Sequence, residues 1–361
     1  MKKGLTFDDI MLIPSYTEVS SRSECSTKTL LFGRSLDHPV VPANMDTITE
    51  QAMLAAIFNT GGIAFIHRFM SIKDQFNMVK HALLSDYQFA IEWNESPAFI
   101  PFTIGMKENL PDVWNTLAPL VYHYGEDQAV VRTINCLLLD VAHANSKQVV
   151  DRINEIRVQY AGPLIVGNVA TYDGVRRLID AGVDGVKVGI GNGSICSTRL
   201  VTGHGVPQVT ALQEADRARS HAGLGYSDFA IISDGGCNYY GDVVKALSLG
   251  ANLVMTGKLF AGCTETPGMM INNSQGIPSK LYRGMASWEA QNERQFSGKT
   301  AEGVSHVVPI KGSAVNIVSD IQGAIRSALS YSGVTTIEDM YRNAEFIVQT
   351  SSGINESQTR R

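Results

Sequence analysis

A glycine-rich segment in the middle of the sequence has the residue types best suited to binding an anion. Residues 185–199 read Gly-Val-Lys-Val-Gly-Ile-Gly-Asn-Gly-Ser-Ile-Cys-Ser-Thr-Arg. Glycines at positions 189, 191 and 193 allow positive φ and let backbone N–H groups approach a ligand closely. Ser194 adds a hydroxyl donor, so the loop would suit a phosphate.

The same segment ends on a cysteine that could be a nucleophile. Cys196 follows a run of oriented backbone N–H groups and precedes Arg199, and both features would favour its thiolate. Thr198, two residues further on, could hand a proton to a leaving group. A glycine-rich turn with no ligand is the alternative, because such a loop alone is a weak signal.

Composition narrows the class of protein. The 361 residues are 44% hydrophobic and 18% charged, as expected of one large soluble domain. A net charge of −5 argues against nucleic acid or a membrane surface as the main partner. Five widely spaced cysteines indicate neither a disulfide framework nor a metal site. With no signal peptide and no long apolar run, the sequence predicts a cytoplasmic protein.

Short apolar segments alternate with helical periods along the chain. Eight segments are candidate strands: Val40–Asn44, Gly62–His67, Ile100–Ile104, Cys136–Val141, Pro163–Val169, Gly185–Gly189, Phe229–Asp234 and Leu253–Gly257. Helical spacing is clearest at Ser146–Tyr160, Thr171–Ala181, Gly241–Leu249 and Ser313–Ser332. This alternation predicts an α/β fold, a single (β/α)₈ TIM barrel over residues 1–361. A doubly wound open sheet is the alternative.

A barrel places its active site in the loops that follow the strands. Three such loops here carry chemistry: the Cys196 loop, Ser233–Gly236 and Thr256–Lys258. Asp234 could accept hydrogen bonds from two ribose hydroxyls, or it could serve as a helix cap or structural turn. Asp140, at the end of the fourth strand, has the same two interpretations.

Residues 264–312 follow the last strand and are too long for a simple turn. They are expected to form an active-site loop whose polar part, Gln291–Ser305, is a mobile flap. The polar tail from Ser351 to Arg361 is expected to be mobile in isolation.

Several motifs occur together in one order along the chain. They are Leu5–Asp9, Ala43–Thr47, Gly167–Thr171, Gly185–Arg199, Thr202–Gln208, Ser233–Gly236 and Tyr282–Met285. Together they closely resemble the inosine-monophosphate dehydrogenase and guanosine-monophosphate reductase family. The resemblance implies a barrel, usually in a homotetramer, that binds a purine 5′-monophosphate and a nicotinamide cofactor.

The resemblance also implies roles for individual residues. Cys196 would attack C2 of the purine to give a covalent thioimidate. The other implied contacts are Asp234 with the ribose, Ser194, Gly236, Gly257 and Tyr282 with the phosphate, Met285 with the base, Glu302 with the purine edge, and Asp140 and Asn168 with the nicotinamide riboside. Carbonyls of Gly191, Gly193 and Cys196 would hold potassium, completed by Glu356 of a neighbouring subunit. Lys258 stands where the family has serine or glycine, and it would add a charge at the phosphate.

The two branches of the family differ in how the thioimidate is made and resolved. The reductase takes ammonia from GMP and adds hydride from NADPH, whereas the dehydrogenase passes hydride from IMP to NAD and activates water with an Arg-Tyr pair. Here Arg294-Gln295 lacks that tyrosine and the flap is short. The paired regulatory (CBS) modules of most dehydrogenases have no room between Ile72 and Phe99.

These features favour a GMP reductase, with Glu289 as the acid partner of Thr198. An IMP dehydrogenase without regulatory modules is the first alternative, because Tyr282-Arg283-Gly284 and the tail at Glu356 resemble that branch. A nucleotide-binding scaffold without catalysis is the second alternative.

Overall fold

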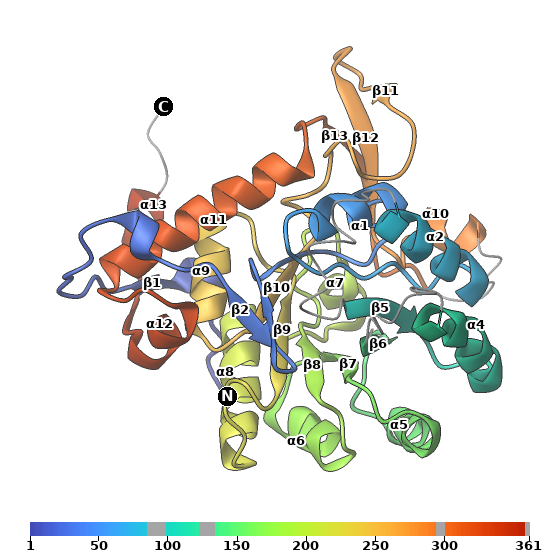
Figure 1. The fold of residues 1–361 in the computed structure, drawn as a ribbon. Helices are drawn as coiled ribbons and strands as arrows, with labels where there is room; N and C mark the ends of the chain where they lie inside the picture. The colour runs from blue at the N-terminus through green and yellow to red at the C-terminus, as the bar shows by residue number, and fades with distance from the viewer. Residues whose placement is uncertain (85–98, 123–133, 294–299, 358–361) are drawn as a thin grey trace.

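Seven parallel strands form the central sheet of the computed structural model (Figure 1). The structure describes residues 1–84, 99–122, 134–293 and 300–357. In sheet order the strands are β4 (Val40–Pro42), β10 (Leu253–Thr256), β9 (Ala230–Asp234), β8 (Gly185–Val188), β7 (Leu164–Val169), β6 (Ile134–Asp140) and β5 (Phe99–Ile104). Every neighbouring pair in this sheet is parallel.

The strand order is that of a barrel, since the first strand pairs with the last and the others follow in turn. The α/β fold class is therefore confirmed. Seven of the eight predicted strands are thereby accounted for. The remaining one, Gly62–His67, lies between β4 and β5 in the chain. It is buried, but among the described residues it joins no ladder. The prediction of a strand there was wrong, because an apolar run reports burial and not hydrogen bonding.

Alternation along each strand separates two apolar layers. In β6, Cys136 and Leu138 belong to the cluster inside the barrel, while Leu137 and Leu139 pack in the cluster beneath the helices. The next inward position on β6 is Asp140. The interior therefore changes from apolar to charged at the carboxyl ends of the strands, which is where a ligand would enter.

Helices surround the sheet. Those that alternate with strands are α1 (Gln51–Phe58), α2 (Ile72–Leu84), α4 (Leu110–Tyr122), α5 (Lys147–Gln159), α6 (Tyr172–Asp180), α8 (Gln208–His221), α9 (Tyr240–Ser248) and α11 (Ala314–Tyr331). The four helices predicted from spacing are confirmed to within one residue at each end. Their starts have a local cause at Ser146, Thr171 and Ser313, whose side chains accept hydrogen bonds from the first turn.

The chain ends meet on one side of the barrel. Strand β1 (Ile10–Leu12) pairs with β14 (Phe346–Val348). Part of the tail that was expected to be mobile in isolation forms α13 (Ser351–Glu356), capped by Thr350, and residues 358–361 lie outside the described residues. The remaining elements of the ends are η1 (Phe7–Asp9), η2 (Arg22–Glu24), α12 (Ile337–Asn343) and the hairpin of β2 (Thr29–Leu31) with β3 (Arg34–Leu36).

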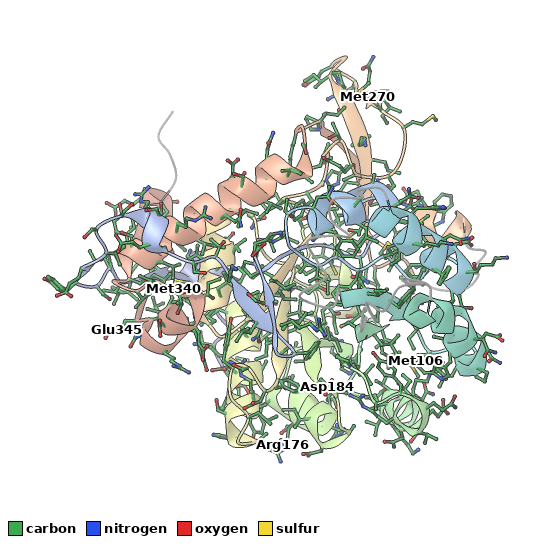
Figure 2. All side chains as sticks on the ribbon, in the orientation of Figure 1. Met106, Arg176, Asp184, Met270, Met340 and Glu345 are labelled. Carbon is green, nitrogen blue, oxygen red and sulfur yellow. The ribbon has the colours of Figure 1, made fainter. Side chains whose placement is uncertain are left out.

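The segment 264–312 holds more regular structure than expected. It contains an antiparallel sheet of β11 (Ile271–Asn272), β12 (Pro278–Arg283) and β13 (Ser305–Pro309), and the short helix α10 (Trp288–Glu293). The sheet projects as an arm that carries Met270 (Figures 1 and 2). Of the predicted flap, residues 294–299 lie outside the described residues. No described helix is long and apolar enough to cross a membrane.

His38 makes stability depend on pH. Its ring is fully buried; Nδ1 accepts from Val40 N, and Nε2 lies 2.9 Å from Thr60 Oγ1. Burial lowers the pKa of His38 to about 4, against the opposing effect of the nearby Asp37. We expect the free energy of unfolding to fall by up to about 3 kcal/mol between pH 6.5 and 4, because only the unfolded chain takes up this proton.

Denaturant titrations at pH 7, 5.5 and 4.5 measure this dependence. In the His38→Asn variant the free energy of unfolding should fall less on acidification, because the contribution of His38 is removed. His204→Asn, at an exposed histidine, is the matched control and should keep the parent's slope. An unchanged slope in His38→Asn would contradict the prediction.

Candidate active site

The Cys196 loop lies between β8 and the short helix α7 (Thr198–Thr202), and the chain returning from the arm packs against it. Val304 N donates to Ile195 O, and Ser197 N donates to Glu302 O, both at 3.0 Å. Residues 302–304 are thereby fixed beside the cysteine.

All five cysteines lie in described residues, and they differ in exposure. Cys196 is partly exposed, whereas the other four are buried. Burial raises the pKa of Cys237 well above its usual value. Burial and the nearby Glu265 raise the pKa of Cys263 to about 11. These two thiols also lie near the strand ends, and both stay protonated at neutral pH. Cys196 is the only one of the three that is partly exposed.

A chain of polar contacts leads away from Cys196. Its Sγ lies 3.2 Å from Thr198 Oγ1, which donates to Glu302 Oε2 at 2.8 Å. The three side chains form a path from a thiol through a hydroxyl to a carboxylate, an arrangement that can move a proton.

The carboxylate expected at Thr198 was that of Glu289, and the structure corrects this pairing. Helix α10 buries Ala290 and Gln291, so Glu289 in the same turn faces solvent. Its Oε1 accepts a hydrogen bond from Ser305 Oγ at 2.5 Å. That hydrogen bond is the main cause of the lowered pKa of Glu289. Glu302 occupies the expected place because residues 302–304, just before β13, lie beside the cysteine loop.

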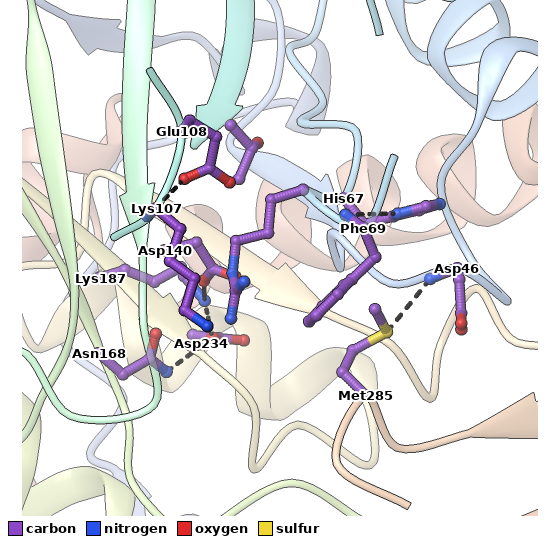
Figure 3. A network of polar contacts seen from close by, with 12 residues as sticks. Asp46, His67, Phe69, Lys107, Glu108, Asp140, Asn168, Lys187, Asp234 and Met285 are labelled. Carbon is purple, nitrogen blue, oxygen red and sulfur yellow. Dashed lines mark hydrogen bonds and ion pairs between the residues drawn. The ribbon is translucent and has the colours of Figure 1, made fainter. Parts of the chain in front are cut away.

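A second cluster joins the four strands β6, β7, β8 and β9 at the mouth of the barrel (Figure 3). Lys187 Nζ lies 2.6 Å from Asp234 Oδ2 and 3.1 Å from Asp140 Oδ1. Asn168 Nδ2 donates to Asp234 Oδ2 at 2.9 Å. Burial alone would lower the pKa of Lys187, but the two carboxylates outweigh it and the pKa is raised. The lysine therefore stays charged.

Sequence reasoning found Asp140, Asn168 and Asp234 but missed Lys187. The available signal was a lysine between Val186 and Val188 in a strand expected to be buried. Because the two valines face the helices, the lysine must face the interior, where a charge requires partners.

The structure brings some of the residues that were predicted to contact a phosphate close together. Ser194 Oγ lies 3.3 Å from the hydroxyl of the buried Tyr282. A Cβ on Gly257 would lie 2.7 Å from that hydroxyl, so a side chain at this position would displace it. Gly236 has φ +81°, a backbone conformation that favours glycine. Lys258 is exposed, and its Nζ donates to Asn238 Oδ1 at 2.7 Å.

Met285 is held from the opposite side of the barrel mouth. Asp46 N contacts Met285 Sδ at 3.3 Å (Figure 3). The Asp46 carboxylate pairs with Arg283 at 2.8 Å, and each of these two side chains is only 11% exposed. A buried ion pair thus joins the loop after β4 to β12 and fixes the backbone that carries Met285.

The potassium residues are not assembled within one chain. Gly191 has φ +75°, and Gly193 O accepts from Cys196 N. Glu356 ends α13, which lies well away from α7 (Figure 1). No group of three or more His, Cys, Asp or Glu with metal-binding geometry occurs in the described part of the chain. The potassium site stays a prediction.

Comparison with known proteins decides the family. A model described as the IMP dehydrogenase / GMP reductase domain matches residues 4–360. The chain belongs to this family. Its members include the inosine-5′-monophosphate dehydrogenase of Cryptosporidium parvum, which is 34% identical over 385 residues, covering 98% of this chain and 94% of the relative.

Two further relatives of the IMP dehydrogenase / GMP reductase family are longer than this chain. The inosine-5′-monophosphate dehydrogenase of Nitrosopumilus maritimus is 31% identical over 472 residues, covering 99% of this chain and 98% of the relative. The inosine-5′-monophosphate dehydrogenase of Streptococcus pyogenes is 33% identical over 475 residues, covering 99% of this chain and 95% of the relative. Both alignments exceed the 361 residues here, so those relatives contain residues with no counterpart in this chain. This agrees with the predicted lack of inserted regulatory modules.

Proposed function

We propose that this chain oxidises inosine 5′-monophosphate to xanthosine 5′-monophosphate, with NAD as the hydride acceptor. The sequence interpretation favoured GMP reduction with NADPH. The observation that carries the change is that three relatives, at 31–34% identity and nearly full coverage, are all named inosine-5′-monophosphate dehydrogenase. The Thr198–Glu302 contact supports it, because a carboxylate behind a hydroxyl can activate water.

In the first step the Cys196 thiolate adds to C2 of the purine. A C–S bond forms, the hydride at C2 departs, and a thioimidate remains on the enzyme. The thiol of the partly exposed Cys196 gives up its proton to solvent before the attack, which leaves the Glu302 carboxylate free for the second step. The product of this step is a covalent adduct that water must then release.

The cofactor site fits a nicotinamide. Within the described residues, Asn168 Oδ1 is buried and has no hydrogen-bond partner. A carboxamide N–H of the cofactor would satisfy it. Asp140, 3.1 Å from Lys187, would accept from the ribose hydroxyls of the cofactor. When bound, NAD supplies the acceptor for the hydride that leaves C2.

In the second step water attacks C2 and the C–S bond breaks, which gives XMP and restores the thiol. The dehydrogenase pattern uses a flap tyrosine here, and this sequence has Gln295 in its place. Glu302, through Thr198, would take the proton of the attacking water. This path needs no tyrosine.

The nucleotide would contact the cluster around Lys187 and the residues around the Cys196 loop. Asp234 would accept from the ribose hydroxyls, and Ser194, Tyr282 and the backbone of Gly236 and Gly257 would surround the phosphate. Met285 would pack on the base. The purine edge would meet Glu302, which lies beside Cys196.

Lys258 is the residue that distinguishes this phosphate site from the family pattern. We expect Lys258→Ser to raise the KM for IMP by about three- to fivefold with little change in kcat, because an exposed charge contributes modestly to binding. The effect should shrink in high salt. Steady-state kinetics at two salt concentrations measure it, with the exposed Lys147→Ser as control. An unchanged KM would place the ammonium away from the phosphate.

Absorbance at 340 nm tests the function. One reaction holds enzyme, IMP, NAD and potassium, and the other holds enzyme, GMP and NADPH. We expect a rise in the first and no change in the second. A fall in the second would make the chain a reductase, and no change in either would indicate the non-catalytic scaffold.

The assembly would complete the potassium site. Because α13, which ends at Glu356, lies away from α7 of its own chain (Figure 1), a neighbouring subunit would have to supply the glutamate. We propose a homotetramer in which Gly191, Gly193 and Cys196 contribute carbonyls.

A further inference from the structure

Three charged side chains form a layer across the mouth of the barrel. The positions below them on the strands are apolar: Leu138 lies below Asp140 on β6, and Ile232 lies below Asp234 on β9. Lys187 comes from β8, which pairs with β9. Inward-facing layers of such barrels are normally filled by branched apolar residues. A charged layer in this place therefore calls for a functional explanation.

A glycine makes room for the lysine. On the strand between β6 and β8, Gly167 pairs with Asp140 on one side and with Lys187 on the other. A Cβ on Gly167 would lie 2.5 Å from Lys187 Cβ. Since Gly167 has no side chain, the lysine reaches across β7 to Asp140 as well as to Asp234.

The lysine holds two carboxylates with one ammonium group. Its side chain is 5% exposed, and those of Asp140 and Asp234 are each 19% exposed. Among the described residues, Arg68 also pairs with this group, with its Nε 3.7 Å from Asp140 Oδ2. The two cations balance the two anions, and Lys187 is the cation that contacts both anions.

We propose that Lys187 is a positioning residue that couples the nucleotide site to the cofactor site by fixing Asp234 and Asp140 relative to each other. This rests on the proposed function, in which Asp234 binds the ribose of the substrate and Asp140 that of the cofactor. A ligand on one carboxylate orders the shared ammonium, so the second ligand meets a carboxylate already in place. Lys187 itself touches neither the reacting carbon nor the hydride.

The coupling between the nucleotide site and the cofactor site is tested by ligand binding in a variant that cannot turn over its substrate. In the Cys196→Ser background, calorimetry gives the Kd of IMP alone, of NAD alone, and of IMP with saturating NAD. We expect NAD to tighten IMP binding there. Adding Lys187→Met should weaken each ligand by about tenfold or more and bring the coupling factor close to one, because charge-assisted hydrogen bonds to both carboxylates are lost. Lys187→Arg should restore part of the coupling.

Lys245→Met is the matched control. Lys245 is another largely buried lysine, whose Nζ donates to Phe7 O at 2.8 Å outside both clusters. It should leave both Kd values and their coupling unchanged. The proposal is overturned if Lys187→Met weakens only one ligand, or if the arginine and methionine variants behave alike.

A readout without ligands separates this proposal from the proposed function. Lys187 faces Asp140 and Asp234, with Arg68 beyond Asp140 and Lys107 and Glu108 at the edge of the network (Figure 3). Without the ammonium, acidification from pH 7 to 5 should raise the melting temperature of Lys187→Met relative to its parent, as one carboxylate takes up a proton. The same shift in both proteins would overturn the proposal.

Two other results would require a changed experiment. If the parent binds GMP and NADPH instead, the proposed function fails and the coupling is judged with those ligands. If Lys187→Met does not fold, Lys187→Met/Asp140→Asn replaces it, with Asp140→Asn as reference. The double variant must then bind IMP about tenfold more weakly than its reference, and equal affinity overturns the proposal.

Discussion

The Cys196→Ser substitution is expected to lower kcat for IMP oxidation by at least about 10⁴-fold, because it removes the nucleophile on which both chemical steps depend. IMP binding should change by less than about threefold, since serine keeps the size of the side chain and leaves the ribose and phosphate contacts in place. Absorbance at 340 nm measures turnover, and calorimetry measures the Kd of IMP.

Cys263→Ser is the control for this experiment. Cys263 also follows a barrel strand, but it is buried and the pKa of its thiol is raised to about 11, chiefly by burial. Its replacement should leave kcat within about twofold of the parent, because a protonated buried thiol takes no part in attack. Retained turnover in Cys196→Ser would remove covalent catalysis from consideration.

The barrel could be predicted because burial and periodicity repeat along the chain. Strands such as Cys136–Val141 are apolar on both faces, and helices such as Ser146–Tyr160 carry their own caps. The segment Gly62–His67 has the same apolar character but no ladder in the described structure. Hydrogen-bond pairing depends on the neighbouring backbone, and a single segment does not encode it.

The candidate site also contains residues that the sequence predicts and a contact that it does not. Cys196 and Asp234 could be found because Cys196 lies in the loop after β8 and Asp234 ends β9, and parallel strands end at one face. Glu302 was recognised as a contact of the purine edge but not as the partner of Thr198. That contact joins residues 104 positions apart and exists because residues 302–304, just before β13, lie beside the cysteine loop. Sequence spacing favoured Glu289, which helix α10 turns towards solvent.

The second large effect concerns Glu302. We expect Glu302→Gln to lower kcat by about 10²-fold by slowing the attack of water, since glutamine cannot take a proton from Thr198. Hydride transfer should persist, because Cys196 remains. Mixing enzyme with IMP and NAD in a stopped-flow instrument should then give a burst of about one NADH per subunit, followed by a slow steady state limited by release of the adduct.

Glu289→Gln is the matched control, because it makes the same chemical change at an exposed carboxylate of the same segment. It should show the parent's kcat, and a loss as large as that of Glu302→Gln would return Glu289 to the proton path. If Glu302→Gln abolishes the burst as well, Glu302 acts already in the attack of Cys196 on C2. A burst that survives while turnover falls assigns Glu302 to the water step. It would also explain how a chain with Gln295 in place of the flap tyrosine can complete the reaction.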